Sequence, residues 1–157
     1  MDEKSAYTEK AREIIDDNSY MVVCTATPEG KPWSAPVFFA NDPDYREFYF
    51  ISAIDSRHAE DIEANPRVAL TIFDSSSPVG TSDGVQIDGT ASVVEKEGIN
   101  KAVKIYSDRL SKKSSSTDTN YDPEEYLAPA EFRFFEVKAQ KVYVTGADRR
   151  VEVDMGK

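Results

Sequence analysis

The sequence predicts a mainly β fold, an antiparallel barrel of six to eight short strands with about three helices on its outside. Short runs of β-branched and aromatic residues outnumber the segments with helical periodicity. Tight turns join most of these runs, which favours antiparallel pairing. The 157 residues are 39% hydrophobic and show no repeat or linker, so we expect one core and one domain over residues 1–157.

Apolar spacing and breaker residues define the elements of the first half. A continuous apolar run of seven residues is typical of a buried strand, whereas spacing of three and four residues indicates an amphipathic helix. Ser56 is a good N-cap, and Asn65-Pro66 ends the helix that it begins. The expected elements are a helix over 5–17, strands over 20–26, about 31–40 and 47–53, and a helix over 56–65.

The second half repeats this alternation with one longer helix. Gly89 lies inside a strand pattern and is a candidate β-bulge, and a break is expected near Gln140. A polar stretch over 111–122 is expected to be a mobile surface loop. The expected elements are strands over 67–73 and 84–94, a helix over 98–110, β-type sequence over 131–144 and a short strand over 151–153.

Composition excludes several classes of function. The formal net charge of −10 disfavours nucleic acid as a partner, because clustered cations bind its phosphates. The charged amino terminus and the lack of any long apolar run predict a cytoplasmic protein that does not contact membranes. One histidine, His58, and one distant cysteine, Cys24, predict neither a metal site nor a disulfide. Cys24 is expected to be a small core residue.

One segment carries residues suited to binding an anion. Ser56, Arg57 and His58 follow a strand and open a helix, whose first turn has unpaired N–H groups and a positive dipole end. A hydroxyl, a guanidinium and an imidazole would add three side-chain donors. The alternative is that Ser56 only caps the helix while Arg57 and His58 are solvated.

The surrounding pattern resembles the pyridoxamine 5′-phosphate oxidase-like, FMN-binding split-barrel superfamily. The resemblance rests on the strand that ends in Ile51-Ser52-Ala53, on Ser56-Arg57-His58-Ala59 and on Asn65-Pro66-Arg67-Val68-Ala69-Leu70. Family members typically carry Ser-Arg-Lys, a short helix and then Asn-Pro-x-Val-x-Leu. The hairpin over 27–39 and the segment 84–91 also look like that family, so the resemblance covers residues 20–95 well.

The resemblance implies a split barrel, a cofactor and a set of contacts. It implies a homodimer with two FMN molecules at the subunit interface. Ser56, Arg57 and His58 become phosphate ligands, and Ser52 contacts the ribityl or phosphate region. The implied contacts with the flavin ring are the strand from Ser34 through Pro36 to Val37, with Gln86 as a contact from the partner subunit.

Two departures from the family pattern bear on function. His58 stands where lysine is usual in the family, and Ser34 stands where the true oxidases place an arginine, so we expect looser binding of FMN or a different flavin. The Arg-x-His motif that binds the substrate phosphate of the true oxidases is absent, because His58 is the only histidine. Oxidation of vitamin B6 is therefore not expected.

The sequence favours an FMN-dependent oxidoreductase that transfers hydride or electrons to or from a small-molecule substrate. No acid or base residue can be assigned. Two alternatives stay open: a split barrel that binds deazaflavin F420 or haem, and a non-enzymatic flavin-binding or stress-related protein.

Overall fold

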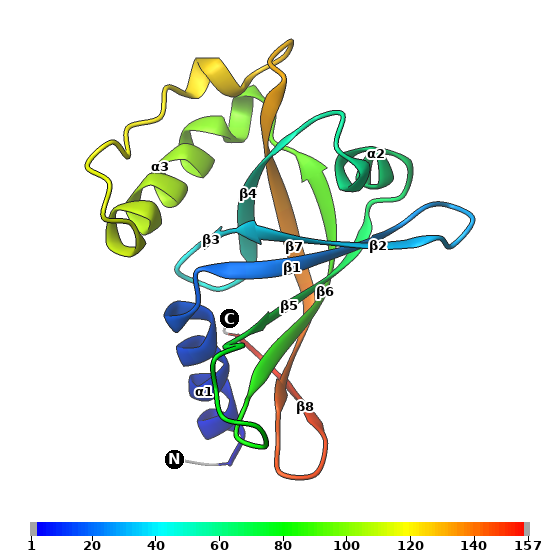
Figure 1. The fold of residues 1–157 in the computed structure, drawn as a ribbon, viewed down its shortest axis with the longest axis vertical. Helices are drawn as coiled ribbons and strands as arrows, with labels where there is room; N and C mark the ends of the chain where they lie inside the picture. Colours follow the sequence, from blue (N-terminus) through cyan, green and yellow to red (C-terminus); the bar gives the residue numbers. More distant parts are fainter. Residues whose placement is uncertain (1–2, 156–157) are drawn as a thin grey trace.

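Eight antiparallel strands form one sheet that curls into a barrel in the computed structural model, which describes residues 3–155 (Figure 1). Along the sheet the order is β2-β1-β5-β6-β7-β4-β3, and β8 pairs with β7. The strands are β1 (Tyr20–Ala26), β2 (Pro32–Phe38), β3 (Ala40–Asn41), β4 (Glu47–Ala53), β5 (Arg67–Phe73), β6 (Gly84–Val93), β7 (Phe132–Thr145) and β8 (Arg150–Val153). The expected mainly β, antiparallel split barrel is confirmed.

Three α-helices lie outside the barrel, as expected (Figure 1). They are α1 (Glu3–Asp17), α2 (Arg57–Ala64) and α3 (Lys96–Lys113), with a short 3-10 helix η1 (Pro123–Tyr126) after the polar loop. In Figure 1, α2 and α3 lie on opposite sides of the upper part of the barrel, and α1 lies below. No helix among residues 3–155 is long and apolar enough to cross a membrane.

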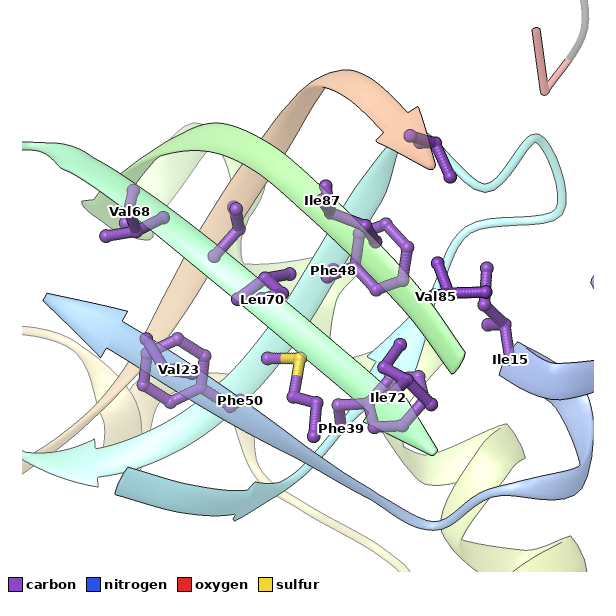
Figure 2. Close-up of a cluster of buried hydrophobic side chains, with 14 of the residues drawn as sticks. Ile15, Val23, Phe39, Phe48, Phe50, Val68, Leu70, Ile72, Val85 and Ile87 are labelled. Carbon is purple, nitrogen blue, oxygen red and sulfur yellow. The ribbon is translucent and has the colours of Figure 1, made fainter. Parts of the chain in front are cut away.

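Strand alternation builds the core inside the barrel. In β1, Met21 and Val23 are buried while their neighbours face outward, because successive side chains of a strand point to opposite faces. Figure 2 shows side chains from several strands meeting in this interior. The rings of Phe50 and Phe135 stack there, with centroids 5.1 Å apart. Each such buried side chain stabilises the fold by about 1.5–3 kcal/mol.

Helices α1 and α2 extend this core, and α3 covers a second one. Ala11 and Ile15 of α1 and Ala59 and Ile62 of α2 belong to the cluster inside the barrel. The second cluster lies between α3 and the outer face of β4 and β7, and consists of Ala40, Tyr49, Val94, Ile99, Ala102, Val103, Tyr106 and Phe134. The barrel is therefore covered on the α3 side.

The predicted bulge at Gly89 is confirmed, and it explains the break expected near Gln140. The pairing of β6 with β7 shifts at Asp88/Gly89, so that Asp88 opposes Lys141 while Gly89 opposes Ala139. Gln140 is the extra residue, and β7 continues through it. A Cβ on Gly89 would lie 2.6 Å from the carbonyl oxygen of Lys138, so only glycine fits this close approach.

Three expectations differ from the structure. The strand expected over 31–40 is divided, because the chain turns at the fully buried Phe39 and β3 pairs with β4 instead of β1. Helix α3 begins before Gly98 and extends into the polar stretch. Cys24 is half-buried on the outer face of β1 and is not a core residue, since alternation with Met21 and Val23 places it there.

Candidate functional site

The turn between β4 and α2 brings together most of the residues predicted to bind an anion. Ser56 has extended backbone angles of φ −69° and ψ 149°, and its Oγ accepts a hydrogen bond from the Ala59 amide at 3.4 Å. It is therefore the N-cap of α2, as predicted. At the other end, Asn65 donates from Nδ2 to the Ala26 carbonyl at 3.0 Å, which fixes α2 against β1.

Three polar side chains converge beside this helix start. His58 Nε2 lies 2.7 Å from Ser52 Oγ and 3.2 Å from Ser56 Oγ, and the two hydroxyl oxygens are 3.1 Å apart. Ser52 is buried at the end of β4, whereas Ser56 and His58 are half-buried. The cluster is therefore compact, and part of it is accessible from solvent.

The environment of His58 favours the neutral imidazole. Burial lowers the pKa of His58, and the nearby carboxylate of Asp61 opposes this shift. Asp61 is itself buried and accepts a hydrogen bond from Thr25 Oγ1 at 2.7 Å. The ring of His58 also lies 6.1 Å from that of Phe50. A bound anion would have to draw a proton onto His58 to gain a full charge from it.

Arg57 supplies the permanent charge at the mouth of the site. It is exposed, and its guanidinium lies over the indole of Trp33, 4.3 Å from the ring centroid. One Nη2–H donates to the Pro32 carbonyl at 3.4 Å. These contacts with the β1–β2 hairpin hold the guanidinium beside the start of α2, so Trp33 orients Arg57.

Arg133 is a further cation near this cluster that the sequence did not indicate. It is buried on β7 and is the cross-strand partner of Ser52, so both side chains lie on the same face of the sheet. Its Nη2 is 3.1 Å from Glu95 Oε2, and its Nε has no hydrogen-bond partner among residues 3–155. The pairing of β4 with β7 is long-range, and no local motif marks it.

The other predicted contacts lie elsewhere in the protomer. Ser34 and Pro36 are exposed on the outer face of β2, whereas Val37 packs against the core from the opposite face. Gln86 lies on the outer face of β6, where Arg150 Nε donates to its Oε1 at 2.6 Å. Cross-strand pairing places Pro36, Val22, Thr71 and Gln86 in one row, so that Pro36 and Gln86 are roughly 14 Å apart.

The geometry at the start of α2 is suited to anion binding rather than to nucleophilic catalysis. Among residues 3–155, no carboxylate hydrogen-bonds to the His58 ring, so the Ser52–His58 contact lacks the acid of a catalytic triad. The same residues include no metal-binding group of three or more His, Cys, Asp or Glu side chains. Hydroxyl, imidazole and guanidinium donors beside a helix N-terminus are typical of a phosphate site.

The sequence is similar to that of a known protein family. Residues 7–146 match the family profile described as pyridoxamine 5′-phosphate oxidase. A pyridoxine/pyridoxamine 5′-phosphate oxidase from Rubrobacter xylanophilus is 39% identical over 67 residues. The matched segment is 43% of this chain and 30% of that enzyme, so the similarity spans less than a third of the relative's length.

Two solved structures share the fold at low sequence identity. A heme-binding protein from Mycobacterium smegmatis matches with a TM-score of 0.73 and 19% identity, over 95% of this chain and 58% of that one. The heme storage protein HutZ from Vibrio cholerae matches with a TM-score of 0.69 and 16% identity, over 89% of this chain and 95% of that one. These likenesses establish the architecture of the barrel.

Proposed function

The chain belongs to the pyridoxamine 5′-phosphate oxidase family, and from this premise we propose that it is an oxidoreductase that holds FMN by its phosphate at the start of α2. The observation that supports this most directly is the convergence of Ser52, Ser56 and His58 within hydrogen-bonding distance of one another. Arg57 adds a charge beside them.

The residues at this position fit a phosphate group. The first amides of α2 have no acceptor within the helix, so the N–H groups of Arg57 and His58 are available to phosphate oxygens. Hydrogen bonds to a charged group contribute about 1.5–3 kcal/mol each. Arg57 together with one or two hydroxyl donors therefore suffices for a specific phosphate contact. Buried Arg133, which pairs with Glu95, lies beside Ser52 on the same face of the sheet.

We place the flavin ring along the outer face of the sheet, in a homodimer. Ser34 and Pro36 lie exposed on β2, and Gln86 lies in the row of Pro36 on the same face. Tyr20 and Phe73 leave 65% and 43% of their surface exposed on this outer face. A second subunit would bury these rings, and its Gln86 would reach the cofactor of the first. Val37 would contact the ring only through its backbone.

The flavin, when bound, supplies hydride or electron transfer, and this chain's residues bind and orient it. Arg57 and the two serines fix the phosphate end, and Trp33 keeps Arg57 in place. The substrate is a small molecule other than pyridoxamine phosphate. Binding of that phosphate in the true oxidases uses the histidine of an Arg-x-His motif, and the sole histidine of this chain, His58, belongs to the cofactor site. Haem is the second candidate cofactor, since the two solved relatives are named as heme-binding and heme storage proteins.

Identification of the ligand tests the proposal. We expect the freshly purified protein to be yellow, and mass spectrometry of the released ligand to give FMN. In titrations of the protein freed of ligand, FMN should bind about a hundredfold more tightly than riboflavin, which lacks the phosphate. Equal affinities for the two would refute the phosphate site. A Soret band would indicate that the cofactor is haem and not FMN. Retention of F420 in preference to FMN would indicate the deazaflavin.

The position of His58 predicts that FMN affinity depends on pH. Burial lowers the pKa of His58 in the free protein. The negative charge of a bound phosphate raises that pKa, so binding takes up a proton. FMN affinity relative to the His58→Lys variant should therefore rise as the pH falls from 8 to 6, by up to about tenfold per pH unit. Fluorescence titration of FMN at each pH measures this ratio.

Two controls isolate His58 from other titrating groups. The ratio to His58→Lys cancels the ionisation of the FMN phosphate itself, and riboflavin should bind with no such dependence. A flat ratio between pH 8 and pH 6 would exclude protonation of His58 on binding.

The stability of the unliganded protein against unfolding should change with pH in the direction opposite to FMN affinity. A lowered pKa in the folded state means that the unfolded chain binds the proton more readily, so stability falls as the pH drops through about 6.5.

A further inference from the structure

A cavity lies on the opposite face of β4 from the phosphate site. It has a volume of about 510 Å³ and lies where β4, α3, η1 and the start of β7 meet. Helix α3 is at the upper left in Figure 1. Ile51 faces it, while the next residue, Ser52, faces the α2 cluster on the other side of the strand. Its size is within the range of sites for small ligands.

Aromatic residues make up half of the lining of this cavity. Four of the eight lining residues are aromatic: Tyr106, Tyr121, Tyr126 and Phe132. Tyr106 and Tyr121 pack edge to face with centroids 5.7 Å apart, and Tyr126 lies 5.7 Å from Tyr121. Phe132 is 51% exposed, so its side chain is accessible to a ligand. The rings offer faces on which a planar ligand can stack.

The phenol hydroxyls of this wall are free to meet a ligand. Among residues 3–155, the tyrosine hydroxyls that donate hydrogen bonds to other side chains are those of Tyr45 and Tyr49, both outside the cavity. Burial raises the pKa of Tyr106, Tyr121 and Tyr126, and each pKa is raised further by a neighbouring acidic or phenolic group. The three phenols therefore stay neutral at physiological pH.

The charge around the cavity has one sign. Within residues 3–155, the ionisable side chains that line it besides the phenols are the carboxylates of Glu125 and Glu131, and none of its lining residues is Lys, Arg or His. Four other cavities of the described residues each include at least one Lys or Arg. Aromatic faces and carboxylates both attract cations and disfavour anions. The cavity therefore selects against phosphorylated ligands.

We propose that this cavity binds a planar aromatic cation, which stacks against the tyrosine and phenylalanine rings while Glu125 and Glu131 complement its charge. A quaternary or protonated ring nitrogen on a fused aromatic system has the required shape and sign. The proposal is independent of the cofactor held at α2, because the two sites lie on opposite faces of β4 and share no residue.

Three matched probes test the proposal by direct binding to the whole protein. N-methylquinolinium is cationic, quinoline is neutral at pH 7.5, and 2-naphthoate is an anion of similar size. We expect calorimetric or NMR titration at low salt to give about tenfold tighter binding of N-methylquinolinium than of quinoline, and no measurable binding of 2-naphthoate. Equal binding of the cation and quinoline, tighter binding of the anion, or no binding of the cation would overturn the proposal.

Variants of the wall identify the site. Phe132→Ala and the pair Glu125→Gln with Glu131→Gln should each weaken N-methylquinolinium binding about fivefold or more, because one removes a stacking face and the other the complementary charge. Glu124→Gln, on the same 3-10 helix but outside the lining, is the matched control and should change nothing. All of these variants should bind FMN normally, so loss of the cation site and failure of the FMN site are distinguishable. Unchanged probe affinity in the wall variants would place the probe elsewhere.

Discussion

Replacing Arg57 and His58 together by alanine is expected to weaken FMN binding by about a hundredfold or more while the fold stays intact. Arg57 carries the permanent charge at the start of α2, and His58 Nε2 lies 2.7 Å from Ser52 Oγ. The double variant removes the guanidinium and the imidazole, and leaves hydroxyls and helix amides as donors to the phosphate. Two charge-assisted hydrogen bonds lost at about 1.5 kcal/mol each correspond to this factor.

The measurement is an FMN titration followed by flavin fluorescence, with thermal unfolding as a check on the fold. Arg57 is exposed and its stacking on Trp33 is worth at most about 1 kcal/mol, so the melting temperature should move by only a few degrees. Lys104→Ala with Lys112→Ala removes two cations from the exposed face of α3 and serves as the charge control. If the double variant bound FMN as tightly as the wild type, the phosphate site proposed at α2 would be wrong.

The local part of the site could be predicted from the sequence because its signals are local. A strand, a turn and an N-cap serine lie within ten residues, and the structure confirms the strand end and the cap. The bulge at Gly89 was also predictable, since a glycine inside a strand pattern favours one. Both features depend on backbone preferences of single residues and their neighbours.

The features that the sequence did not predict depend on pairing between distant segments of the chain. Arg133 lies opposite Ser52 only because β7 pairs with β4, and nothing near Arg133 in the sequence indicates this. The division of the strand expected over 31–40 has the same cause, because the chain leaves β1 at Phe39 and β3 then pairs with β4, which is far from β1 in the strand order of the sheet. The aromatic cavity likewise combines residues of four separate elements. Sequence patterns predicted the strands and the helix α3 that line the cavity, but not which of these elements lie next to one another.

Arg109 of α3 contacts residues that are distant in the sequence, at the end of α1 and in β3, and so joins three elements. Its side chain is 12% exposed and its guanidinium lies 4.5 Å from the centroid of the Phe39 ring. Nη2 donates to the carbonyls of Ile15 at 2.6 Å and Asn18 at 2.7 Å, at the end of α1, and Nη1 donates to Asn41 Oδ1 at 3.0 Å in β3. Burial lowers the pKa of Arg109, and Asp16 opposes the shift. The Ile15 carbonyl lies in the last turn of α1, where helix carbonyls have no partner within the helix.

Arg109→Met is therefore expected to destabilise the protein by about 3 kcal/mol, because methionine replaces only the aliphatic part of the side chain and leaves these acceptors without a donor. For a chain of this size, the melting temperature should fall by roughly 6–12 °C. Calorimetry or thermal unfolding by circular dichroism gives the value, with Lys104→Met as control. Lys104 is 76% exposed on the same helix, so its replacement should cost less than about 0.5 kcal/mol. Equal melting temperatures for both variants would mean that Arg109 does not hold α1, α3 and β3 together. The melting temperature of Arg109→Lys should lie between those of these two variants, because an ammonium cannot donate to three acceptors with the planar geometry of a guanidinium.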